Sequence, residues 1–192
     1  MDKYKNKYRI PSARAQWWDY GWDGSYFITI CTTLRRHFFG RVVDDEMELS
    51  ALGRIADERW RDLINHATNL ELGPHVVMPN HVHGILNLHA RAMPFRFIPA
   101  ESAQTDPLNQ EEEIPKTIGQ MRFRNPGKNT VSTIVGGYKS AVSKEAAKEG
   151  LDFGWQSRFH DHLIRDAAEY QRIADYIISN PARWKGDKFY CD

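Results

Sequence analysis

Four stretches of the chain carry short apolar runs rich in β-branched and aromatic residues, and this pattern predicts four β-strands. They are expected at residues 25–33, 70–78, 81–88 and 156–165. A fifth region, residues 41–49, has short apolar segments on either side of an acidic Asp-Asp-Glu turn and predicts a small hairpin.

Apolar residues at helical spacing predict three helices, at about 51–66, 131–149 and 167–180. Ser50 is a favourable N-cap for the first helix. Pro181 ends the third, because the residue before a proline avoids the helical region.

The predicted order is strand, helix, strand, strand, helix, strand, helix. Its first six elements match the split βαβ, ferredoxin-like arrangement, an antiparallel sheet with helices on one face. The fold class expected is therefore α+β. The third predicted helix is not part of that arrangement. It is expected to dock on the other face of the sheet, where a site could form.

Two segments differ from the rest. Residues 1–24 form a basic and aromatic arm that includes Trp17 and Trp18. Such an arm could hold phosphates and stack bases, or simply pack over the domain. Residues 91–130 are rich in proline and acidic residues and predict a long, partly disordered insertion in a domain that spans 25–192.

The composition of the 192 residues sets limits on the class of protein. At 41% hydrophobic the chain can build a core, and it has no apolar run of roughly 18 to 20 residues that could cross a membrane. A cytoplasmic location without membrane contact is expected. The net charge is +1, but basic ends flank an acidic middle, which is compatible either with binding a polyanion or with ordinary solvated faces.

The candidate chemistry begins at His81 and His83, inside the third predicted strand. Alternate residues of a strand share a face, so both imidazoles point the same way and Val82 points into the core. Their Cα atoms would lie roughly 6.6 Å apart, close enough to reach one metal ion. The alternative is a pair of ordinary core or surface histidines.

The last predicted helix could complete the site. Tyr176 and Asn180 are four residues apart and share a helix face. An amide oxygen from Asn180 could join the two imidazoles around Mg²⁺ or Mn²⁺. A phenol has an ordinary pKa of about 10 and attacks poorly unaided, but a cation on a phosphodiester would make the phosphorus more electrophilic. Attack by Tyr176 would leave a covalent phosphotyrosine and a free hydroxyl. Tyr176 could instead be a core aromatic, with Tyr138 or Tyr170 as the nucleophile.

Several segments together resemble a known family, the REP-associated tyrosine transposases, which are single-tyrosine HUH transposases (His, bulky apolar, His). The resemblance covers about residues 15–90 and 130–190. The segments that carry it are Tyr26-Phe27-Ile28-Thr29-Ile30-Cys31, Met78-Pro79-Asn80-His81-Val82-His83-Gly84, Tyr138-Lys139-Ser140, Phe159-His160-Asp161-His162-Leu163-Ile164-Arg165 and Tyr176-Ile177-Ile178-Ser179-Asn180-Pro181.

The resemblance implies an HUH endonuclease fold with a C-terminal catalytic helix. It implies cleavage and rejoining of single-stranded DNA next to a hairpin, as in DNA transposition. Carried over, His81 and His83 are metal ligands, Asn180 is the third polar ligand and Tyr176 is the nucleophile. Relatives often have glutamine as the third ligand. The resemblance leaves the oligomeric state open between a monomer with its own site and a homodimer in which each tyrosine helix serves the partner's site.

Weaker expectations concern DNA contacts. Phosphate contacts are expected from Arg35, Arg36, Lys139 and Arg165, whose alternative is solvated charge. His160 and His162 form a second His-x-His, and His162 is expected near the site. Two other functions stay open: a hairpin-binding regulator that has lost cleavage, and an unrelated metal hydrolase that uses water.

Overall fold

The computed structural model describes residues 3–4, 7–8, 23–89 and 129–190. Most of the predicted arm, with Trp17 and Trp18, and nearly all of the predicted insertion at 91–130 lie outside the described residues. The chain divides into two units, Met1–Asp19 with Met93–Pro126, and Tyr20–Ala92 with Gly127–Asp192. In the first unit, β1 (Lys3–Tyr4) pairs antiparallel with β2 (Lys7–Tyr8). The second unit carries the candidate site.

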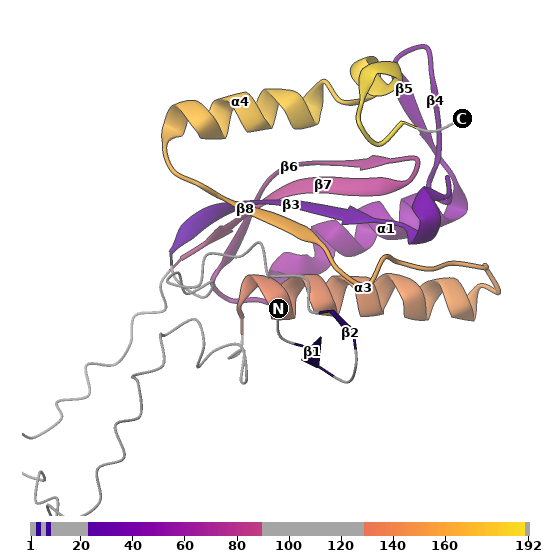
Figure 1. Cartoon of the computed structure of the whole chain (residues 1–192), viewed down its shortest axis with the longest axis horizontal. Coiled ribbons are helices and arrows are strands. Elements are labelled where there is room, and N and C mark those ends of the chain that lie inside the picture. Colours follow the sequence, from indigo (N-terminus) through magenta and orange to yellow (C-terminus); the bar gives the residue numbers. More distant parts are fainter. Residues whose placement is uncertain (1–2, 5–6, 9–22, 90–128, 191–192) are drawn as a thin grey trace, which may run out of the picture. The chain divides into compact units, whose positions relative to one another are not determined.

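The second unit is built on a four-stranded antiparallel sheet (Figure 1). Its strands are β3 (Gly24–Cys31), β6 (Leu70–Met78), β7 (His81–Leu88) and β8 (His160–Ile164), in the order β6-β7-β3-β8. The central pair, β3 and β7, are the first and third strands in chain order, as the split βαβ arrangement requires. The predicted α+β class and antiparallel sheet are therefore confirmed.

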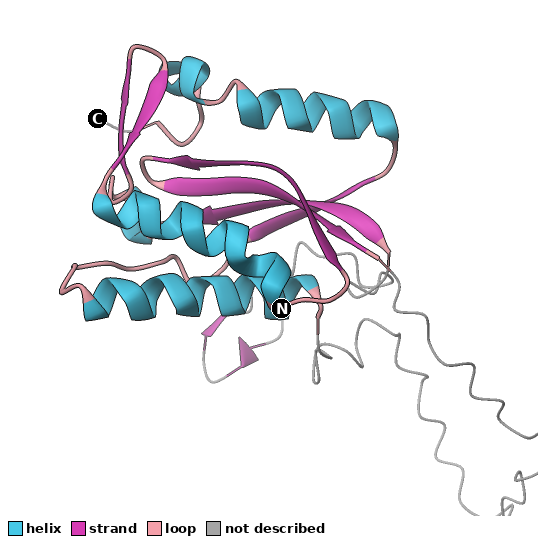
Figure 2. Ribbon diagram, turned by 180° about the vertical axis from the view of Figure 1, so that it is seen from behind, coloured by secondary structure: helices cyan, strands magenta, loops and turns pink. Residues whose placement is uncertain are grey.

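One face of the sheet is covered by α1 (Ala51–Arg61) and α3 (Val131–Lys148), as Figure 2 shows from behind. Ser50 caps α1 as predicted, since its Oγ accepts a hydrogen bond from the Gly53 amide at 3.0 Å. Val82, on the face opposite the histidines, is fully buried as predicted. No helix in the described part of the chain is long and apolar enough to cross a membrane.

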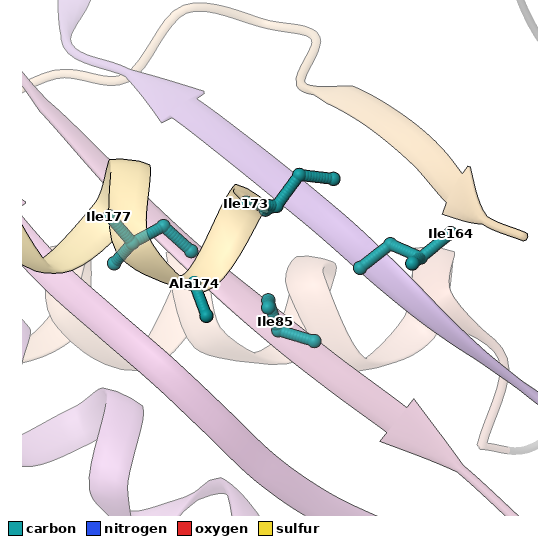
Figure 3. Close-up of a cluster of buried hydrophobic side chains, with 5 residues drawn as sticks. All are labelled: Ile85, Ile164, Ile173, Ala174 and Ile177. Carbon is teal, nitrogen blue, oxygen red and sulfur yellow. The ribbon is translucent and has the colours of Figure 1, made fainter. Parts of the chain in front are cut away.

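α4 (Ala167–Ile178) lies on the other face of the sheet (Figure 1). Its apolar stripe of Ile173, Ala174 and Ile177 packs against Ile85 of β7 and Ile164 of β8 (Figure 3). Each buried isoleucine contributes on the order of 1.5–3 kcal/mol, which fixes the helix in register with the strands beneath it.

Several predicted element ends are wrong. The last strand begins at His160 rather than 156, because Trp155 bridges Thr32 and the Gln156 amide bonds the Cys31 carbonyl. The first strand ends at Cys31, and Thr33–Arg35 form a 3₁₀ turn with positive φ at Leu34 and Arg35.

Two predicted helices also end early. α1 gives way to a 3₁₀ turn at Asp62–Asn65, and α4 stops two residues short of Asn180. A 3₁₀ helix, Pro181–Gly186, follows α4, with the proline in its first turn. The predicted hairpin is present as β4 (Gly40–Val43) and β5 (Glu46–Leu49).

Candidate functional site

The two histidines of β7 lie side by side under α4 and the segment that follows it. In the register with β3, His81 pairs with Cys31 and His83 with Thr29. Their ring centroids are 4.3 Å apart, and both side chains are fully buried. The structure thus places both imidazoles on one face, as the strand periodicity predicted.

Hydrogen bonds orient the inner nitrogen of each ring. His81 Nδ1 lies 2.8 Å from Asn80 Oδ1, and the Asn80 amide group donates to the Phe189 carbonyl at 2.9 Å. Since Asn80 thereby presents its oxygen, His81 Nδ1 carries the proton and Nε2 keeps a lone pair. His83 Nδ1 lies 2.9 Å from Thr29 Oγ1. Partners of this kind hold metal-ligating histidines in place.

The outer atoms of the site include two buried acceptors without a partner in the described part of the chain. They are His81 Nε2 and Asn180 Oδ1. Buried polar atoms in folded proteins are nearly always paired, so two orphaned acceptors call for an explanation. A cation bound by both atoms would supply one. Within residues 23–89 and 129–190, no three His, Cys, Asp or Glu side chains converge as a metal site, so any such ion would also need the amide oxygen.

Burial keeps both imidazoles neutral. It lowers the pKa of His81 well below its ordinary value, and the charges of His83, Lys188 and Arg35 add to that effect. Burial also lowers the pKa of His83 to about 3, against the opposing charge of Asp187. Protons therefore do not compete for the ring lone pairs in the neutral range.

Tyr176 stands over the histidines. Its Oη lies 3.3 Å from His83 Nε2 and donates a hydrogen bond to Asp187 Oδ2 at 2.9 Å. Burial, followed by the hydrogen bond and charge of Asp187, raises the pKa of Tyr176 to about 12, while the Asn180 side chain opposes the shift. The phenol is therefore protonated at neutral pH and needs a base or a cation to become a nucleophile.

Asp187 is a residue that the sequence analysis missed. Besides the Tyr176 phenol, its carboxylate accepts hydrogen bonds from the Asn180 amide group at 3.2 Å and the Phe189 backbone amide at 2.7 Å. It follows the 3₁₀ helix, whose path depends on the packing of Trp184 against Met78. No periodicity or motif marks such a position.

Of the predicted DNA contacts, Arg35 lies beside this cluster. Arg35 donates to the Lys188 carbonyl at 3.0 Å, and its guanidinium lies 5.1 Å from the centre of the Phe189 ring. Phe189 itself packs on His81, with centroids 4.5 Å apart. Arg36 instead pairs with Asp152 at 3.3 Å, and both of these side chains are largely exposed.

Other candidates lie away from the histidines. Lys139 donates to the Gln156 carbonyl at 2.6 Å and thereby ties α3 to the segment before β8. Tyr138 is buried and donates to the Ala56 carbonyl at 3.0 Å, so it is a core residue that joins α3 to α1. Tyr170 packs against the cluster that anchors α4. Arg165 follows β8, and its backbone amide donates to Glu169.

The second His-x-His shares the face of the first. On β8, His160 pairs with Thr29 and His162 with Phe27, so the row His83, Thr29, His160 crosses three strands. His162 Nε2 lies 2.9 Å from Glu169 Oε1 of α4. His162 therefore lies on the same sheet face as the histidine pair, next to Phe27 and against α4, and its contact with the candidate site stays a prediction.

No family model matches the chain. An uncharacterized protein of Haemophilus influenzae is 29% identical over 183 residues, which are 94% of this chain and 93% of that protein. Among solved structures, a REP-associated tyrosine transposase bound to a REP hairpin matches with a TM-score of 0.55 and 20% identity, over 93% of this chain and 77% of that one. The chain therefore has a fold similar to that of a REP-associated tyrosine transposase.

Proposed function

We propose that this protein is a metal-dependent nuclease and strand transferase of the single-tyrosine HUH type, acting on single-stranded DNA near a hairpin. The observation that carries the proposal is the meeting of Tyr176 with the histidine pair, the phenol oxygen being 3.3 Å from His83 Nε2. The hairpin partner is suggested by the REP hairpin bound in the structurally similar transposase.

His81 Nε2, His83 Nε2 and Asn180 Oδ1 are the atoms that would hold Mg²⁺ or Mn²⁺, two of them buried without another partner in the described residues. When bound, the ion would offset the charge of a DNA phosphate and make its phosphorus more electrophilic. His-Val-His at residues 81–83 would then be the HUH motif, and the fold would be the HUH endonuclease fold.

The chemical step uses the phenol. The Tyr176 oxygen bonds to phosphorus, the bond from phosphorus to one strand oxygen breaks, and that oxygen leaves as a hydroxyl after taking up a proton. With its pKa near 12, Tyr176 must give up its own proton during attack. Asp187, 2.9 Å away, is placed to receive it. In rejoining, the hydroxyl of a new strand bonds to the phosphorus of the phosphotyrosine. The bond from phosphorus to the Tyr176 oxygen breaks, and that oxygen takes up a proton.

The test is a covalent protein–DNA band. Purified protein is incubated with single-stranded hairpin oligonucleotides and Mg²⁺ or Mn²⁺, and products are resolved on a denaturing gel. We expect an adduct that Tyr176→Phe abolishes and that Tyr170→Phe, a control on the same helix, leaves intact. A band that survives in Tyr176→Phe would refute the assigned nucleophile.

The remaining outcomes separate the other functions. Failure to form an adduct with any hairpin or metal would favour a binding regulator that does not cleave. Cut DNA without an adduct would favour a hydrolase that uses water.

A further inference from the structure

A groove runs along the side of α4 and opens at Tyr176. Its volume is about 1020 Å³, and its lining residues come from α4, from β8 and from the 3₁₀ helix after α4. Phe27 of β3 also lines it. Small-molecule pockets span about 300–1,000 Å³, so this groove is large enough for several units of a polymer.

The α4 side of the groove carries a cation beside the nucleophile. Arg172 and Tyr176 are four residues apart on α4, a rise of about 6 Å along the helix, and Asn180 follows after the helix end. The Arg172 side chain is 73% exposed, so its guanidinium can reach a ligand in the groove. Arg183, from the 3₁₀ helix, supplies a second cation to the lining. Guanidinium groups suit phosphate oxygens in charge and in geometry.

The two acidic side chains of the lining are already engaged. Glu169 lies 2.9 Å from His162 Nε2, accepts the Arg165 backbone amide and lies 3.3 Å from Arg172. Asp175 accepts a hydrogen bond from Gln171 at 2.8 Å. Arg172 and Arg183 thus balance the two carboxylates of the lining in formal charge, and Arg172 lies directly beside Glu169.

Flat rings lie beside the cations. Phe27 is partly exposed, and its ring centroid is 5.0 Å from that of His83 and 6.2 Å from that of Tyr176. His162 is 38% exposed in the next strand. Ring faces of this kind accept bases with little regard to sequence.

We propose that this groove holds the single-stranded segment adjoining the scissile phosphate. Arg172 and Arg183 contact its phosphates, and Phe27 and His162 offer ring surface to a base. This proposal deepens the proposed function and rests on it for the choice of DNA as ligand. Space favours this side of Tyr176, because Asp187 and Phe189 occupy the side over the histidines.

The first experiment measures equilibrium binding without cleavage. Protein carrying Tyr176→Phe is titrated in EDTA against a fluorescent oligothymidylate of about 15 nucleotides, near the upper site size of single-strand binding modules. The oligothymidylate Kd is measured at several salt concentrations for Arg172→Ala, Arg183→Ala and the double variant. Arg54→Ala is the control, since Arg54 is exposed on α1, on the opposite face of the sheet.

Each arginine that meets a phosphate should carry about 0.7 of the slope of log K against log salt for a single strand. The double variant should therefore bind several-fold more weakly, with a slope smaller by about 1.4. Arg54→Ala should change neither quantity. Equal losses in all variants, an unchanged slope, or failure of the parent to bind the oligonucleotide would overturn the proposal.

A second measurement locates the strand directly. An oligothymidylate with 5-iodouracil substitutions is crosslinked by ultraviolet light, and the attached peptide is identified by mass spectrometry. Crosslinks to Phe27 or to His162 are expected, and crosslinks only to α1 or α3 would place the strand elsewhere. Neither measurement needs cleavage. DNA binding in the groove without a Tyr176 adduct would therefore refute only the proposed function. An adduct together with an unchanged Kd and salt slope in the arginine variants would refute only the groove proposal.

Discussion

At the level of single residues, the hydrogen bond between Tyr176 and Asp187 determines how the phenol is held. The carboxylate accepts the phenol proton at 2.9 Å and also accepts from the Asn180 amide group. A carboxylate in this position stabilises the protonated phenol and disfavours the phenolate. The carboxylate that adds to the effect of burial on the pKa of Tyr176 is therefore also the nearest hydrogen-bond acceptor for the phenol proton.

Replacing Asp187 by Asn should lower the pKa of Tyr176 from about 12 toward its ordinary value near 10. The shift should be partial, because desolvation by burial is its largest cause. The measurement is a pH titration of protein labelled with carbon-13 at the tyrosine ζ position. Tyr176→Phe identifies the resonance by its disappearance. An unchanged or higher pKa in the Asn variant would show that Asp187 does not act on the phenol.

Sequence patterns predicted the histidines, the tyrosine and the asparagine of this cluster. They did not predict Asp187, whose position depends on tertiary packing. His81 and His83 share a strand face, which follows from the period of two. Tyr176 follows from helical spacing, whereas Asn180 lies two residues past the end of α4, at the start of the 3₁₀ helix. Asp187 lies beyond the 3₁₀ helix, where the chain direction depends on tertiary contacts of Trp184, and a local pattern does not contain that information.

At the level of elements, β7 carries the histidines on one face, and on the other face it buries Val82 and Leu86 on either side of Gly84, which has no side chain. A Cβ atom added to Gly84 would meet the Trp60 ring at 2.2 Å, and Trp60 is fully buried. The absent side chain allows α1 to approach the strand directly behind His83. The position of the histidine strand is therefore set from both faces of the sheet.

Gly84→Ala should destabilise the protein, because overpacking of a dense core typically costs about 1–3 kcal/mol. Gly136→Ala is the matched control, since nothing lies within 4 Å of a Cβ atom added there on α3. Alanine in a helix interior should raise stability by about 0.5–1 kcal/mol relative to glycine. Urea unfolding of both variants gives the two free energies. Equal effects at the two glycines would contradict the close contact with Trp60.

Element types were predictable, and so were the ends of β6 and β7, whereas the ends of β3, β8, α1 and α4 were not. Apolar periodicity identified all four strands of the sheet and the three helices of the second unit. β8 starts four residues late because Thr32 and Cys31 pair with Trp155 and Gln156 outside the named strands. These pairings join residues more than 120 positions apart, which lie far beyond the window of any local pattern.

At the level of the whole molecule, the candidate site joins segments that are distant in the chain. The contact between Tyr176 and His83 spans 93 positions. The isoleucine stripe of α4 predicted a docked helix, and in the folded protein α4 lies on the sheet face opposite α1 and α3 (Figure 1), where Tyr176 contacts His83. The groove could not be predicted, because its lining comes from four elements.

The assembled site should make stability depend on metal. Mn²⁺ that binds only the folded state should raise the free energy of unfolding by about 2.7 kcal/mol at one hundred times its Kd. His81→Leu should abolish that gain. In EDTA the same variant loses the unpaired acceptor Nε2 but also the hydrogen bond from Nδ1 to the buried Asn80 Oδ1, and these opposed effects should keep its change in stability within about 3 kcal/mol.

Thermal unfolding with and without Mn²⁺ provides the measurement, and His66→Leu, at an exposed surface histidine, is the control. Equal stabilisation of His81→Leu and wild type by Mn²⁺ would exclude His81 as a ligand.

The buried acceptors His81 Nε2 and Asn180 Oδ1 also have an evolutionary consequence. In a lineage that still depends on the site, these groups are maintained although they weaken the fold without a bound cation. Once a copy is released from that requirement, selection no longer maintains a ligand set at these positions, and replacements that leave Asn80 and Asp187 with hydrogen-bond partners are free to accumulate. Decay of the gene should therefore be visible at the site itself before it reaches the core of the sheet.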